Sequence, residues 1–200
     1  LGRNHALFLA SRGARVVVND LGGAVDGSGS SATPAQQVVA EIKAAGGDAI
    51  ANADSVATPA GAAHIVQAAL DTWGRLDILI NNAGIAVRKF PQDHTEEEWH
   101  RVMDTNMTSA FLLSQAAYPE FLKSGGGKII NIGSVMTLMG APHAGPYAAS
   151  KGAIVQFTRV CATAWAKDNI QANAVLPGWI DTDLTVAART QVPGLNENVL

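Results

Sequence analysis

Five short apolar runs divide the chain, and polar or glycine-rich stretches separate them. Two of the runs, residues 14–20 and 128–134, are rich in valine or isoleucine, and three weaker ones cover residues 48–54, 76–82 and 169–178. Within the runs the apolar residues are continuous and do not alternate with polar ones. Strands that are covered on both faces of a parallel sheet have this pattern. The runs therefore predict five strands of a buried parallel sheet.

Helical patterns fill the intervals between these strands. Thr58 and Pro59 offer an N-cap and a first helical residue, and Thr95 with Glu98 forms a capping box at the start of another helix. Pro146 begins a further, longer helix. This alternation of strands and helices predicts an α/β fold, a Rossmann-like, doubly wound parallel sheet in three αβα layers. We expect one domain that covers residues 1–200.

The two ends of the chain differ from those of a complete fold of this kind. Residues 1–14 read as the start of a helix with no strand before it. Residues 191–200 contain no pattern of a final strand. We therefore expect a sheet that lacks strands at both ends of the chain.

The charge content indicates a surface that is partly covered by other subunits. Charged residues make up 16% of the chain, whereas about 25% is typical of soluble proteins. The formal net charge is −3 and no basic run occurs, which argues against nucleic acid and anionic membranes as partners. No apolar run approaches the ~20 residues that a membrane-spanning helix needs.

Cysteine and histidine usage adds two further expectations. The single cysteine, Cys161, excludes a disulfide within the chain and suits a reducing compartment, so we expect a cytoplasmic protein. The five histidines show no paired spacing such as HxxxH, so we expect no metal site.

Candidate chemistry centres on the sequence YAASK at residues 147–151. On a helix, Tyr147 and Lys151 lie on one face because they are four positions apart. An ammonium group near a phenol favours the phenolate and so lowers a pKa that is normally near 10, which suits a general acid or base. Chance alone also produces this spacing in many helices. Two further residues favour chemistry: Ser134 ends a buried strand, and Asn106 interrupts an otherwise apolar helix.

Three other features indicate a bound dinucleotide. Gly2 stands at the start of the first helix, where a backbone close to a pyrophosphate is needed. Residues 27–32 imitate a glycine motif, but they follow their strand by several residues, so Gly2 is the better candidate. Asp20 ends a strand and could accept hydrogen bonds from the ribose hydroxyls of NAD, although a strand-end Asp can equally cap a turn. The NNAG motif at residues 81–84 ends another strand.

Taken in order, NNAG, Asn106, Ser134, YAASK and the sequence LPGWIDTDL at residues 176–184 resemble the short-chain dehydrogenase/reductase family. The resemblance covers essentially the whole chain. It implies that Tyr147 is the catalytic acid/base and that Lys151 lowers the pKa of Tyr147 and binds the nicotinamide ribose. It also implies that Ser134 hydrogen-bonds the substrate oxygen and that Asn106 holds a water in a proton relay.

The same resemblance implies two further sets of residues. Those along the cofactor would be Gly2, Asp20, Asp54, Ser55, Asn81, Asn82, Ala83, Gly84, Tyr147, Lys151, Pro177, Gly178, Ile180 and Thr182. Those at the substrate would be Ser134, Met136, His143, Tyr147 and Trp179, with Leu138, Met139 and Leu184 adding to an apolar pocket. Of the family's TGxxxGxG motif only the last glycine, Gly2, is present, and the first and last strands of the family fold are missing. The family also forms tetramers, so a homo-oligomer, a tetramer or a dimer, is expected.

These observations predict an oxidoreductase that passes a hydride between NAD(H) and a secondary alcohol or ketone. Asp20 favours NAD, because the 2′-phosphate of NADP would meet its carboxylate. The small-molecule substrate would be a 3-oxoacyl compound or another largely apolar carbonyl compound, as in 3-oxoacyl reductases and 3-hydroxyacyl-CoA dehydrogenases. The alternatives are a sugar dehydrogenase similar to glucose 1-dehydrogenase, a sugar-nucleotide epimerase, and a nucleotide-binding module without turnover.

Overall fold

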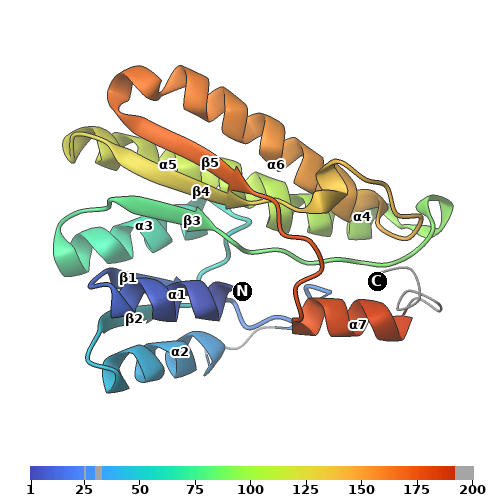
Figure 1. The fold of residues 1–200 in the computed structure, drawn as a ribbon, viewed down its shortest axis with the longest axis horizontal. Coiled ribbons are helices and arrows are strands. Elements are labelled where there is room, and N and C mark those ends of the chain that lie inside the picture. The colour runs from blue at the N-terminus through green and yellow to red at the C-terminus, as the bar shows by residue number, and fades with distance from the viewer. Residues whose placement is uncertain (25, 30–32, 192–200) are drawn as a thin grey trace.

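The computed structural model describes residues 1–24, 26–29 and 33–191. Its strands are β1 (Arg15–Asn19), β2 (Asp48–Asn52), β3 (Ile78–Asn81), β4 (Gly127–Ile132) and β5 (Ile170–Val175). Its α-helices are α1 (Gly2–Ser11), α2 (Thr33–Ala44), α3 (Pro59–Trp73), α4 (Glu96–Met103), α5 (Ser109–Lys123), α6 (Gly145–Ala164) and α7 (Asp183–Gln191). All five strands predicted from the apolar runs are present, and each alternates with helix as expected (Figure 1).

The strands form a parallel sheet in two parts. β1 pairs with β2, and β3, β4 and β5 form the second part in that order. Among the described residues no hydrogen-bonded strand joins β1 to β3, so the sheet is interrupted between these two strands. The predicted absence of a final strand concerns residues 192–200, which lie outside the described residues.

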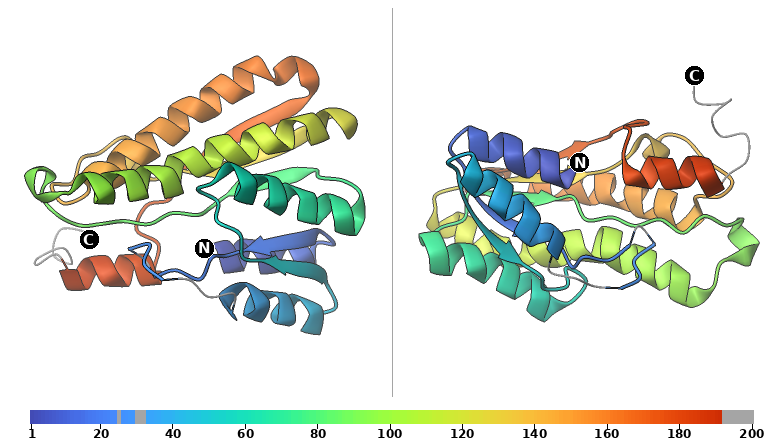
Figure 2. Two further views of the ribbon diagram at one scale, coloured as in Figure 1. Left: turned by 180° about the vertical axis from the view of Figure 1, so that it is seen from behind. Right: turned by 90° about the horizontal axis from the view of Figure 1, so that it is seen from below.

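Helices cover both faces of the sheet. Seen from below, α1 and α7 lie on one side and α3 and α5 lie on the other, with the strands between them (Figure 2). Two clusters of buried side chains hold these layers together. One is centred on Phe121 and Ile129 and joins β3, β4 and β5 to α3, α5 and α6, while the other is centred on Ile42 and Ala49 and joins α1 and α2 to their strands.

Local signals in the sequence fix several helix ends. The Thr58 hydroxyl accepts a hydrogen bond from the backbone N–H of Gly61 at 3.1 Å, and Thr95 and Glu98 form the predicted capping box at the start of α4. The helical pattern that continues from Trp99 does not form one regular helix. A π-helical turn, η2 (Asp104–Thr108), separates α4 from α5. Such turns are often found at functional sites.

Candidate active site

The predicted site residues gather at one edge of the sheet, beyond the carboxyl ends of the strands. Each strand contributes one position there: Asp20 after β1, Asp54 after β2, Asn81 at the end of β3, Ser134 after β4 and Pro177 after β5. Because the strands within each part are parallel, their carboxyl ends lie side by side. Ligands of open α/β sheets bind at this edge.

Lys151 is the most unusual charged group at this edge. It lies on α6, only 3% of it is exposed, and its Nζ donates a hydrogen bond to the backbone carbonyl of Ile132 at 2.6 Å. No carboxylate in the described chain lies within 4 Å of it. Burial lowers the pKa of Lys151 from its ordinary 10.5 to about 8, because the charged form loses hydration. The ammonium therefore remains the main form at pH 7.

Tyr147 lies one turn before Lys151 on α6. The Lys151 Nζ is 5.7 Å from the centre of the Tyr147 ring. The pKa of Tyr147 is raised, because burial outweighs the opposing effects of a hydrogen bond from Ser134 and the positive charge of Arg88. The net shift is thus opposite to the one expected from the spacing, and Lys151 is not among the groups that lower this pKa in the structure; its expected effect on the phenol stays a prediction. The physical reason for the net shift is that the Lys151 ammonium is directed to the Ile132 carbonyl and the phenol is largely desolvated.

Asn106 lies in the π-helical turn and is 1% exposed. Its Oδ1 accepts from the Ile85 N–H at 2.8 Å, and its Nδ2 donates to the Ile85 carbonyl and to the Ser150 hydroxyl, both at 3.0 Å. Ser150 in turn donates to the carbonyl of Tyr147 at 2.7 Å. Asn106 thus ties the loop after NNAG to the helix of Tyr147. Both Nδ2 hydrogens are used, so a water held by Asn106 would bind to its backbone carbonyl or to Oδ1.

Two glycines of the candidate cofactor loops lie close to polar side chains of the site. A Cβ on Gly2 would lie 2.7 Å from Nδ2 of Asn82, which places the start of α1 directly against the NNAG loop. A Cβ on Gly84 would lie 3.4 Å from the Lys151 Nζ and 3.5 Å from Asn106 Oδ1. The open backbone and the buried cation fit a flat, anionic ligand such as a nicotinamide dinucleotide.

The NNAG residues themselves have distinct surroundings. Asn81 is buried and donates from Nδ2 to Oδ1 of Asn131 at 2.7 Å, and so links β3 to β4. Its own Oδ1 is buried and has no hydrogen-bond partner in the described chain. Ala83 and Gly84 are exposed. The motif therefore has a structural first residue and an accessible end that faces the candidate site.

The two acidic candidates occupy loops after β1 and β2. Asp20 is exposed, and its Oδ1 accepts a hydrogen bond from the Gly22 N–H at 2.7 Å, so the turn-capping role considered for it is present. Its other carboxylate oxygen has no partner in the described chain. Asp54 accepts from Nδ2 of Asn52 at 2.7 Å, which is the main cause of its lowered pKa. Ser55 follows in the same loop and accepts from the Ala57 N–H.

The loop after β5 is closed by its own hydrogen bonds. The Pro177 carbonyl accepts from the Val135 N–H at 3.1 Å, and the Gly178 carbonyl accepts from the Ile180 N–H. Thr182 donates its N–H to the Thr185 hydroxyl at 2.9 Å and so starts α7. Ile180 is 44% exposed and available to a ligand. The four predicted cofactor positions therefore lie on one short, ordered connection from β5 to α7.

The predicted substrate residues are less enclosed than expected. Met136 is half-buried in the turn after Ser134, and the His143 ring packs on Phe90 at 4.2 Å between ring centres. Trp179 is 39% exposed, and Leu138 and Met139 are 79% and 61% exposed. Leu138 and Met139 are thus largely open to solvent in this structure, and their place in an apolar substrate pocket stays a prediction. These two side chains follow the short turn η3 (Val135–Thr137), which directs them outward.

Sequence reasoning missed two residues of this region. Ser150 lies inside YAASK, and the only available signal was a hydroxyl between small residues on a buried helix face. Arg88 follows NNAG and lies close enough to Tyr147 for each charge to affect the pKa of the other. Nothing in the sequence pattern indicated that its side chain would turn toward α6.

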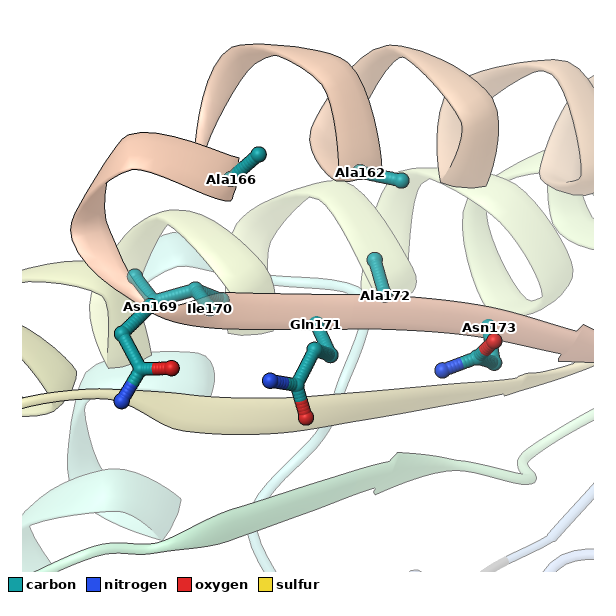
Figure 3. Close-up of a pocket in the computed structure, with 7 residues that line it drawn as sticks. All are labelled: Ala162, Ala166, Asn169, Ile170, Gln171, Ala172 and Asn173. Carbon is teal, nitrogen blue, oxygen red and sulfur yellow. The ribbon is translucent and has the colours of Figure 1, made fainter.

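A separate hollow of about 240 Å³ lies at the other end of β5. Figure 3 shows Ala162 and Ala166 above β5 and the side chains of Asn169, Gln171 and Asn173 along the strand itself. It surrounds the first residues of β5, whereas the candidate site follows the last ones, so it is no part of that site. In the described residues no cluster of metal-ligating side chains occurs, and no helix is long and apolar enough to cross a membrane.

Comparison with known proteins decides the family. A sequence model described as short chain dehydrogenase matches residues 1–193. The chain belongs to this family. A short-chain type dehydrogenase/reductase of Mycobacterium tuberculosis is 41% identical over 177 residues, which cover 88% of this chain and 62% of that protein. A 3-oxoacyl-[acyl-carrier-protein] reductase of Synechocystis is 40% identical over 92% of this chain and 72% of its own length.

The fold agrees with that of solved members of this family. A crystal structure described as a short-chain alcohol dehydrogenase from Sinorhizobium meliloti superposes with a TM-score of 0.85 at 34% identity. That comparison covers 94% of this chain and 71% of the crystallised one. The short-chain dehydrogenase chain described here thus spans between about three fifths and three quarters of the length of these three proteins.

Proposed function

We propose that the protein is an oxidoreductase that transfers a hydride between NAD(H) and a secondary alcohol or ketone. The observation that carries this proposal is the gathering of Ser134, Tyr147, Lys151 and Asn106 at the carboxyl edge of the sheet, joined by hydrogen bonds and close contacts. Family membership supports the reaction class.

Each residue has a task that its surroundings suit. Tyr147 takes the hydroxyl proton of the alcohol during oxidation and returns it to the carbonyl oxygen during reduction. Ser134, whose side chain hydrogen-bonds Tyr147, orients the same substrate oxygen. Lys151 stays mainly cationic at pH 7 and stabilises negative charge at the phenol and at a bound ribose. Asn106 fixes the loop between NNAG and α6.

A nicotinamide cofactor, when bound, supplies the hydride acceptor or donor. Gly2, Asn82 and Gly84 would hold its phosphates and nicotinamide side close to the backbone, and Ile180 and Thr182 would contact its amide. Asp20 would accept the ribose hydroxyl with its second carboxylate oxygen, which has no partner among the described residues; this supports NAD over NADP. The substrate is proposed to be a 3-oxoacyl or similar carbonyl compound, as the name of the Synechocystis relative suggests.

Association into a homo-oligomer is part of this proposal. α5 and α6 expose the apolar side chains of Phe111 and Val160, 42% and 57% respectively. Ala149 is also exposed on α6 and leaves room for close packing of a second helix. A dimer or tetramer built on these helices would cover this surface.

The proposed function is tested with a panel of secondary alcohols and ketones and both cofactors. NADH or NADPH absorbance at 340 nm follows turnover by the full-length protein. We expect NAD-linked oxidation of at least one secondary alcohol, and the matching ketone should be reduced with NADH. Cofactor binding without turnover of any member of the panel would instead support a nucleotide-binding module.

A further inference from the structure

Arg88 lies where a substrate would meet the start of α6. It follows β3 and the NNAG loop, and the next residue, Lys89, forms an isolated parallel bridge with Ala144. The residue after that, Phe90, packs on His143. The segment therefore runs along the residues that immediately precede Tyr147. Arg88 bridges this segment to α7, because its Nη2 donates to the carbonyl of Leu184 at 3.0 Å.

The guanidinium of Arg88 is half-buried and has no carboxylate partner among the described residues. Its Nη1 donates to Oε1 of Gln191 at 3.3 Å, and with the bond to Leu184 this uses two of its five N–H groups. No carboxylate of the described chain lies within 4 Å of it. Burial lowers the pKa of Arg88, which reflects the cost of holding this charge away from water.

Other arginines of the chain are placed differently. Arg3, Arg75 and Arg189 each pair with a carboxylate at the surface. Arg159 is exposed on α6 and donates only to Gln156. Arg88 is set apart by its position beside Tyr147, its partial burial and the three N–H groups that have no acceptor in the described chain. An arginine fork of this kind matches a carboxylate, which it can bind through two parallel hydrogen bonds.

We propose that Arg88 binds a carboxylate of the substrate, so that the substrate is a small hydroxy or oxo acid. This inference rests on the proposed hydride transfer at Ser134 and Tyr147, and it takes a free acid as the substrate in place of the 3-oxoacyl compound. The substrate carboxylate lies on Arg88, while the carbon that bears its hydroxyl lies at Ser134 and Tyr147. The bonds to Leu184 and Gln191 hold the guanidinium in place, and Arg88 is a specificity-determining residue for an acid against its neutral ester.

A positive charge beside Tyr147 has a second effect that the test must separate. Arg88 favours the phenolate of Tyr147, and this effect acts on every substrate alike. If Arg88 only positions α7, its replacement would likewise change kcat/KM for all substrates by a similar factor. Carboxylate binding alone changes the ratio of kcat/KM between an acid and its uncharged ester.

The experiment compares 2-, 3- and 4-hydroxy acids of four or five carbons with their methyl esters. The full-length wild-type protein, Arg88→Gln, Arg88→Lys and the surface control Arg159→Gln are assayed at several pH values, with NADH absorbance as the readout. We expect the wild type to prefer at least one acid. Arg88→Gln should lower its acid-to-ester ratio of kcat/KM about 30-fold, mainly through KM. Arg88→Lys should lower it less, and Arg159→Gln should leave it unchanged.

The proposal is overturned if Arg88→Gln has the same acid-to-ester ratio of kcat/KM as the wild type. It is also overturned if the wild type turns over every methyl ester with a higher kcat/KM than the matching acid. If no alcohol is oxidised at all, the proposed function fails and calorimetry still tests Arg88. Acetoacetate and methyl acetoacetate are then titrated into the wild type and Arg88→Gln in the presence of NAD. Weaker acetoacetate binding by Arg88→Gln, with the methyl ester unaffected, supports carboxylate binding. Carboxylate binding by Arg88 is ruled out if acetoacetate binds to both proteins with equal affinity or binds to neither of them.

Discussion

Replacing Lys151 with methionine should change how the stability of the fold depends on pH. Burial holds the pKa of Lys151 at about 8 in the folded protein, against an ordinary value of 10.5. Between these two values the unfolded chain binds the proton and the folded chain does not. The free energy of unfolding therefore rises with pH through this interval and is lowest below pH 8.

The size of this effect follows from the two pKa values. Integrated from pH 7 to pH 10, the single lysine adds about 2–3 kcal/mol to the free energy of unfolding of the wild type. Lys151→Met cannot make this contribution. Other groups that titrate in the same interval are present in both proteins, so they cancel in the difference between them.

Urea unfolding followed by circular dichroism measures this difference at fixed protomer concentration. The difference in free energy of unfolding between wild type and Lys151→Met should move by about 2–3 kcal/mol in favour of the wild type between pH 7 and pH 10. Lys167→Met removes an exposed lysine and should follow the wild type. A gap that stays constant within 0.5 kcal/mol (roughly the usual precision of such comparisons) would refute the argument that Lys151 is buried as a costly cation.

Two further substitutions test the frame of the site and the cofactor. Asn106→Ala leaves the buried N–H and carbonyl of Ile85 without partners and should cost about 2–4 kcal/mol, seen as a fall of about 5–15 °C in Tm. Ser114→Ala, whose buried hydroxyl has no partner in the described chain, should be close to neutral, and equal Tm values for the two variants would contradict the role of Asn106. We expect the wild type to prefer NAD over NADP about 100-fold in kcat/KM. Asp20→Ala should reduce this preference, mainly by raising kcat/KM with NADP. A wild type that prefers NADP would contradict the role of Asp20 in selecting NAD.

Much of the fold could be predicted from the sequence because its signals are local. Continuous apolar runs identified the buried parallel strands, and Thr58 and Thr95 marked helix starts through caps that act within one turn. The family resemblance led us to expect missing strands, but it did not state that the sheet would divide between β1 and β3. The π-helical turn at Asn106 was not foreseen, because it depends on hydrogen bonds to Ile85 and Ser150, which are far away in the sequence.

The candidate site was predictable in its membership but not in its electrostatics. Spacing placed Tyr147 and Lys151 on one helix face, and strand ends placed Ser134 beside them. The direction of the Tyr147 pKa depends on how deeply the phenol is buried and on where the Lys151 ammonium points, and neither follows from spacing. Arg88 was missed for the same reason, since only the tertiary fold brings its loop against α6 and α7.

Turnover by Tyr147→Phe tests the central claim most directly. The substitution removes the transferable proton and keeps the ring, so folding and NAD binding should remain close to those of the wild type. Single-turnover and steady-state rates are measured with the best alcohol of the panel and NAD. We expect kcat to fall by at least about 100-fold, the lower bound for general acid–base catalysis. A variant that keeps near-normal kcat while binding NAD normally would contradict the assignment of Tyr147 as the catalytic acid/base.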